Sequence, residues 1–181
     1  MVMKKYVDDY ETKINEDEEG KQVKEVVYTG DYFELSVDEA DLKKFKRNCL
    51  LLLAAIILLH VGAGFIANQG MYTFYVSLPY VFVFLSLYFT ALGILRLPQK
   101  TQNLHRDEIG LSFDRMRTAS KFLLVLLVAS VIGEIIYLIF FSSGGLFRES
   151  LFLILEAFAG AAAFVLIQSQ KAIKVQKQDK K

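Results

Sequence analysis

Apolar residues along this chain are gathered in four long blocks, and almost all charged residues lie outside those blocks. A bilayer core about 30 Å thick requires roughly 20 apolar residues in a helix, and each block is close to this length. The predicted spans are 49–67, 72–95, 122–141 and 151–167. A soluble bundle would show polar positions on one face of each helix, but Leu50 to Leu59 has none. The pattern therefore predicts an all-α integral membrane protein, built as a four-helix antiparallel transmembrane bundle.

Lysine and arginine residues flank these spans unevenly. They cluster before the first span, between the second and third, and after the fourth, whereas the 142–150 loop has only Arg148. Positive charges near span ends stay on the cytoplasmic side, so both termini and the 96–121 loop are expected in the cytoplasm. The first apolar block also begins too far from Met1 for a signal peptide. We therefore expect a multi-pass protein of a cell membrane, as in a bacterial inner membrane.

The two predicted outer connections, 68–71 and 142–150, are short. Helices joined by short connections usually pack side by side in opposite directions. We therefore expect the first span to pack on the second, and the third span on the fourth.

The first 35 residues are acidic and alternate as strands do. Tyr6–Ile14 and Lys21–Thr29 are predicted strands, joined by a turn at 15–20. Ser36 and Glu39 form a capping box that begins a helix. The predicted organisation is a cytoplasmic β-hairpin head at 1–35, an amphipathic juxtamembrane helix at 36–48, the bundle at 49–168 and a basic cytoplasmic tail at 169–181.

Composition removes several classes of function. The net charge of +1 combines an acidic head with a basic remainder, which is not the distribution of a nucleic-acid binder. Cys49, the single cysteine, is interpreted as a small apolar residue at the interface, with a lipidated or reactive thiol as the alternative. The sequence has no GxSxG, glycine-rich phosphate loop or CxxC motif. No cofactor is predicted, and the absence of these catalytic motifs favours a protein that is not an enzyme.

Three ionisable residues, His60, Glu134 and Glu156, lie inside predicted spans, where such groups are costly and often functional. Each lies eight residues from the outer end of its span, about 12 Å along a helix, and Tyr80 falls at the same level. Small residues that permit close helix packing lie one turn away, at Gly64, Ser130 and Gly160. We therefore expect an intramembrane polar cluster of His60, Tyr80, Glu134 and Glu156.

This cluster has three interpretations. It is a hydrogen-bonded group that fixes helix packing, with one glutamate protonated. Alternatively, Glu134 and Glu156 exchange protons or hold a cation. In the third interpretation His60, Glu134 and Glu156 are metal ligands with water at an open position, although the sequence has no HExxH or ExxH motif.

The leading hypothesis is a non-enzymatic accessory or interaction subunit of a membrane complex. A protein partner or a second copy would associate through the helices or the N-terminal hairpin. Membrane lipids are further partners, and Arg115 and Arg117 are candidate contacts for their head groups. His105 is expected to be a solvent-exposed loop residue. The alternatives are a small proton- or cation-handling transporter and an intramembrane metal-dependent enzyme.

Overall fold

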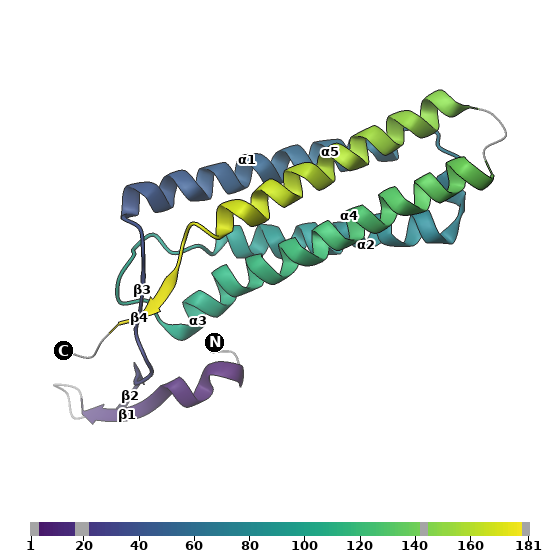
Figure 1. Cartoon of the computed structure of the whole chain (residues 1–181). Helices are drawn as coiled ribbons and strands as arrows, with labels where there is room; N and C mark the ends of the chain where they lie inside the picture. Colours follow the sequence, from purple (N-terminus) through teal and green to yellow (C-terminus); the bar gives the residue numbers. More distant parts are fainter. Residues whose placement is uncertain (1–3, 17–21, 142–144, 179–181) are drawn as a thin grey trace.

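The structure of the chain is a computed structural model that describes residues 4–16, 22–141 and 145–178. Within these residues, four helices are long and apolar enough to cross a membrane (Figure 1). They are α1 Glu39–Gly64, α2 Phe74–Leu95, α4 Arg115–Phe140 and α5 Leu146–Gln170. The prediction of four apolar helices is confirmed, and the chain is mostly helical.

Helix α1 is longer than the first predicted span because it includes the predicted juxtamembrane helix. The two form one continuous helix from Glu39, so residues 36–48 are not a separate element. The side chain of Asp38 caps this helix by accepting a hydrogen bond from a first-turn backbone N–H at 2.7 Å. Ser36, the predicted cap, instead accepts a hydrogen bond from the Lys174 N–H at 3.0 Å. The prediction was wrong because Asp38 offers an equally suitable acceptor two residues closer to the helix.

Helix α4 is extended in the same way at its N-terminal end. The short helix α3, Arg106–Ile109, continues through a π-helical turn, Gly110–Asp114, into α4. Together they form a helical stretch from Arg106 to Phe140. Part of the predicted 96–121 loop is therefore helical and continuous with the third span.

The helices pack as two antiparallel pairs. Helix α1 lies mainly along α5 and α2 mainly along α4, and a contact between α4 and α5 joins the pairs (Figure 1). The expectation that the first span packs chiefly on the second was wrong, although the third and fourth do touch. The reason is the close approach of α2 to α4, which two glycines permit. A Cβ on Gly93 would lie 2.8 Å from Met116 N, and a Cβ on Gly133 would lie 2.7 Å from Tyr75 O.

Two small sheets lie at one end of the bundle, here called the head end (Figure 1). Strand β1, Tyr10–Glu16, pairs antiparallel with β2, Gln22–Tyr28, which confirms the predicted N-terminal hairpin. The first strand begins later than predicted because Lys4–Asp9 forms a 3₁₀ helix. Part of the predicted 15–20 turn lies outside the described residues.

The second sheet joins the segment before α1 to the segment after α5. Strand β3, Phe33–Leu35, pairs antiparallel with β4, Val175–Lys177, with Glu34 opposite Gln176. The N-terminal segment and the C-terminal tail, which the sequence suggests are separate, therefore share a hydrogen-bonded ladder. The opposite end of the bundle, formed by the 65–73 connection and the start of α5, is called the far end.

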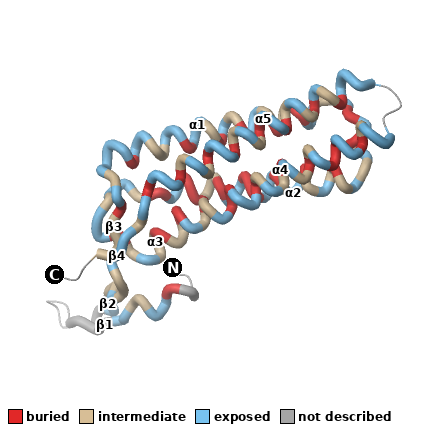
Figure 2. The backbone as a smooth tube through the Cα atoms, in the orientation of Figure 1, coloured by how far each residue is buried: buried red, intermediate tan, exposed pale blue. Residues whose placement is uncertain are grey.

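Buried positions run along the sides of the helices that face one another (Figure 2). Large apolar side chains cover the opposite sides, as in Leu58, which is 74% exposed, and Phe140, which is 72% exposed. This distribution suits helices that face lipid rather than water. Cys49 is fully buried within the core cluster, so its thiol does not lie on the surface where a lipid anchor would be attached.

Candidate functional site

Three of the four predicted polar residues meet in the interior of the bundle. His60 Nδ1 on α1 lies 2.8 Å from Glu156 Oε1 on α5, and both side chains are fully buried. Tyr80 on α2 donates its hydroxyl hydrogen to the His60 carbonyl at 2.9 Å, and its ring lies 4.1 Å from the imidazole. Among the described residues, His60 Nε2 and Glu156 Oε2 have no hydrogen-bond partner. This cluster links three helices, and the Glu156 Oε2 stays buried within it.

Glu134 lies elsewhere, in a second polar cluster at the far end. Its carboxyl faces Asn68 and Glu149, and a Cβ on Gly70 would overlap its Oε2. Glu149 accepts a hydrogen bond from the Gln69 N–H at 3.0 Å. Both carboxyls are at most 1% exposed. Since two adjacent buried carboxylates repel each other, a proton or a cation has to offset their charge.

The structure therefore does not bring His60, Glu134 and Glu156 together. Among the described residues, no group of three or more His, Cys, Asp and Glu side chains is arranged to hold a metal ion. Glu149 was not predicted because the fourth span was expected to begin at residue 151. Helix α5 begins at Leu146, five residues earlier, and this places Glu149 on the buried side of the helix.

A groove between α4 and α5 opens on the outer surface of the bundle, with a volume of about 320 Å³. Small residues of α5 form one wall, at Ala157, Gly160 and Ala161. Glu156 also lines this groove, although its side chain is fully buried. A Cβ on Gly160 would meet no atom within 4 Å. Packing within this chain therefore does not require a glycine at this position.

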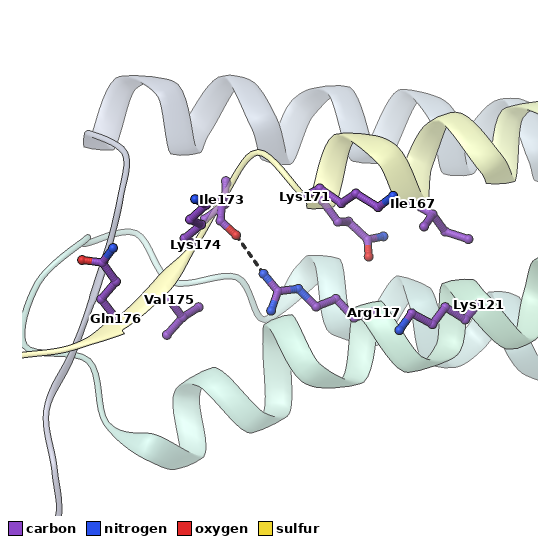
Figure 3. A pocket seen from close by; sticks show the side chains of 9 residues that line it. Arg117, Lys121, Ile167, Lys171, Ile173, Lys174, Val175 and Gln176 are labelled. Atoms are coloured by element: carbon purple, nitrogen blue, oxygen red, sulfur yellow. Dashed lines mark hydrogen bonds between the residues drawn. The ribbon is translucent and has the colours of Figure 1, made fainter.

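A basic groove of about 530 Å³ lies at the head end, between the beginning of α4 and the segment that follows α5 (Figure 3). Arg117 and Lys121 line it from α4, and Lys171 and Lys174 line it from the other side. Arg117 Nη2 donates a hydrogen bond to the Ile173 carbonyl at 2.8 Å, which ties the tail to α4 (Figure 3).

Arg115, the other predicted head-group contact, points to a different surface. It lines a separate groove with Asp114 and Phe122. A helix turns about 100° per residue, so side chains two residues apart point in nearly opposite directions, whereas Arg117 and Lys121 share one face. Lys121, Lys171 and Lys174 were not predicted, although the four-residue spacing of the α4 pair was visible in the sequence.

The hairpin head contacts the helical part of the segment that was predicted to be the 96–121 loop. Tyr10 donates its hydroxyl hydrogen to Asp107 Oδ1 at 2.9 Å. The Tyr28 ring stacks on His105 with centroids 4.1 Å apart, and its hydroxyl accepts a hydrogen bond from the Arg106 N–H at 3.1 Å. His105 is partly buried in this aromatic cluster, so the expectation of a solvent-exposed histidine was wrong.

The contact with Asp107 gives Tyr10 a measurable signature. Burial, this hydrogen bond and the negative charge of Asp107 raise the pKa of Tyr10 from 10.0 to about 12. Because folding favours the neutral phenol, its contribution to docking is complete below pH 10.0 and is lost as the pH rises through about 12. In an alkaline titration followed by tyrosinate absorbance, the difference between the parent and Tyr10→Phe should have a midpoint near 12.

Asp107→Asn provides the matched comparison for this titration. It removes the charge but keeps a side chain of similar size, so the Tyr10 midpoint should fall toward 10.0. A parent midpoint already near 10.0 would show that the head is not docked in this way.

Comparison of the chain with protein-family models, with curated proteins and with solved structures found no match. A function for this chain therefore rests on its own residues. Two features are the strongest candidates for a functional site: the groove between α4 and α5, and the basic groove at the head end.

Proposed function

We propose that this chain is a multi-pass integral membrane protein with its head end in the cytoplasm, as in a bacterial inner membrane. Four apolar helices with outward apolar side chains support the membrane placement. The orientation rests on the lysine and arginine residues around the head end, because such charges stay on the cytoplasmic side.

We further propose that the protein is a non-enzymatic interaction subunit whose α4–α5 groove receives a transmembrane helix of a partner protein. The observation that carries this proposal is the open space at Gly160, where a Cβ would meet nothing within 4 Å. Other glycines, such as Gly93 and Gly133, are required by contacts inside the bundle. In membranes, small residues on a helix surface let a second helix approach closely. Gly160 and its neighbours therefore suit a helix from outside the chain.

Glu156 lines the groove, and its fully buried carboxyl contacts that helix only after the side chain turns outward. Its Oε1 contacts His60, whereas Oε2 has no partner among the described residues. An interhelical hydrogen bond in a membrane contributes about 0.6–2 kcal/mol. We therefore expect the partner helix to carry a hydrogen-bonding side chain, such as Ser, Thr, Asn or Gln, at the depth of Glu156. A different protein fits better than a second copy, because the lipid-facing side chains near that depth, such as Val81 and Ile132, are apolar.

Gly160→Leu is expected to abolish association with the partner, because a leucine side chain would fill the groove. The matched control is Gly62→Leu on α1, since a Cβ on Gly62 also meets nothing within 4 Å. Native mass spectrometry of gently solubilised protein from its own host measures the result. The parent and Gly62→Leu should each carry a second protein that Gly160→Leu lacks. Retention of that protein by Gly160→Leu, or its loss from both variants, would contradict the proposed groove.

A further inference from the structure

We propose that the basic groove at the head end binds the phosphate group of an anionic phospholipid. Its four cationic side chains come from two segments that are far apart in the sequence (Figure 3). Arg117 and Lys121 lie one turn apart on α4, whereas Lys171 and Lys174 follow the end of α5. The fold brings these side chains around one opening. This inference depends on the membrane placement but not on the α4–α5 groove.

Among the described residues, no carboxylate neutralises the positive charge of the groove. The residues that line it include no Asp or Glu. In the described part of the chain, the salt bridges of the head end involve Arg106 and Lys177 instead. Like charges held close together repel each other, and a bound anion relieves that repulsion. Phosphate oxygens accept hydrogen bonds from both lysine and arginine, so a phosphate group is a suitable anion.

The position and the lining of the groove favour a lipid as the source of that phosphate. Ile167 of α5 and Val175 of β4 contribute apolar walls beside the lysines. Phe122, the residue after Lys121, is 62% exposed and marks the beginning of the lipid-facing part of α4. A ligand with an anionic head and an apolar tail would contact both surfaces, as anionic lipids do at basic pockets between spans.

A ligand site differs from ordinary positive charges at a membrane boundary because only particular lysines should matter. Lys121→Gln/Lys171→Gln removes two charges from the groove. Lys43→Gln/Lys44→Gln removes two exposed charges from α1, also near the head end, and is the matched control. Arg117 is left unchanged because it holds the Ile173 carbonyl.

The experiment is a native mass spectrometric titration of the purified full chain with phosphatidylglycerol and, separately, with phosphatidylcholine. The parent and the α1 variant should bind phosphatidylglycerol in preference to phosphatidylcholine. The groove variant should bind it roughly 30-fold more weakly, as expected for two lysines near a lipid phosphate. Lys121→Arg/Lys171→Arg, which keeps the charges, should restore binding and exclude a simple loss of folding.

Three outcomes would overturn this inference. Equal binding of the two lipids would show that the anionic head group is not recognised. Equal weakening in the groove and α1 variants would show that only the total charge matters. Complete displacement of phosphatidylglycerol by an equal concentration of inorganic phosphate would identify free phosphate, not lipid, as the ligand.

Discussion

Gly93→Ala is expected to destabilise the bundle by about 1–3 kcal/mol, the usual cost of inserting a methyl group into a filled core. Gly93 is buried on α2, and its added Cβ would lie 2.8 Å from Met116 N and 2.9 Å from Met116 Cα. These are backbone atoms of α4, so a change of side-chain rotamer cannot relieve the contact. The two helices would have to move apart along their main interface.

Thermal unfolding of the detergent-solubilised protein, followed by helical circular dichroism, measures this loss. For a chain of this size, each kcal/mol corresponds to roughly 2–4 °C in Tm. Gly62→Ala is the control, because its Cβ meets nothing within 4 Å and alanine favours helix by about 1 kcal/mol. Its Tm should be unchanged or higher. Equal Tm values for the two variants would show that α2 and α4 do not approach each other as described.

The existence of the four helices could be predicted because hydrophobic length is a local property of the sequence. The hairpin could be predicted for a similar reason, since alternation and a glycine-containing turn are local signals. Which helices are neighbours could not, because apolar residues surround each span. The α2–α4 contact depends on Gly93 and Gly133, and the sequence around each glycine does not indicate which helix packs against it. Short outer turns suggested the wrong neighbour for α1.

The candidate sites show the same limit. The equal depths of His60, Tyr80 and Glu156 along their spans predicted that these residues lie in one layer, and the structure brings them into contact. Glu134 turns toward the 65–73 connection instead, and a connection without periodic signal offered no way to foresee Asn68 beside it. The β3–β4 ladder was also invisible, since strands of three residues are too short to show alternation.

This ladder has a consequence for the basic groove. The pairing of β3 with β4 places Val175 and fixes the course of the segment that carries Lys171 and Lys174. The Ser36 hydroxyl adds a hydrogen bond to the Lys174 N–H at 3.0 Å. The N-terminal segment therefore helps to position the wall of the basic groove that the C-terminal tail contributes, which gives the head a structural role in addition to any contact with a partner.

His60→Ala and Glu156→Ala are each expected to destabilise the bundle by about 3 kcal/mol, because removing one member of a buried polar pair leaves the other unsatisfied. The two atoms in contact, His60 Nδ1 and Glu156 Oε1, are 2.8 Å apart and fully buried. The double variant should lose little more than either single variant, since the pair is then removed together. The same thermal unfolding experiment, applied to the parent, the two single variants and the double variant, completes this double-mutant cycle.

Gly93→Ala combined with His60→Ala provides a control cycle for the His60–Glu156 pair. Gly93 lies 13 residues from Tyr80 on α2, about 20 Å along the helix, and Tyr80 marks the level of His60. Its effect should simply add to that of His60→Ala, because distant sites without shared contacts are independent. Additive losses for His60→Ala and Glu156→Ala as well would show that their contact contributes nothing to stability. Glu156 would then not be held in place by His60.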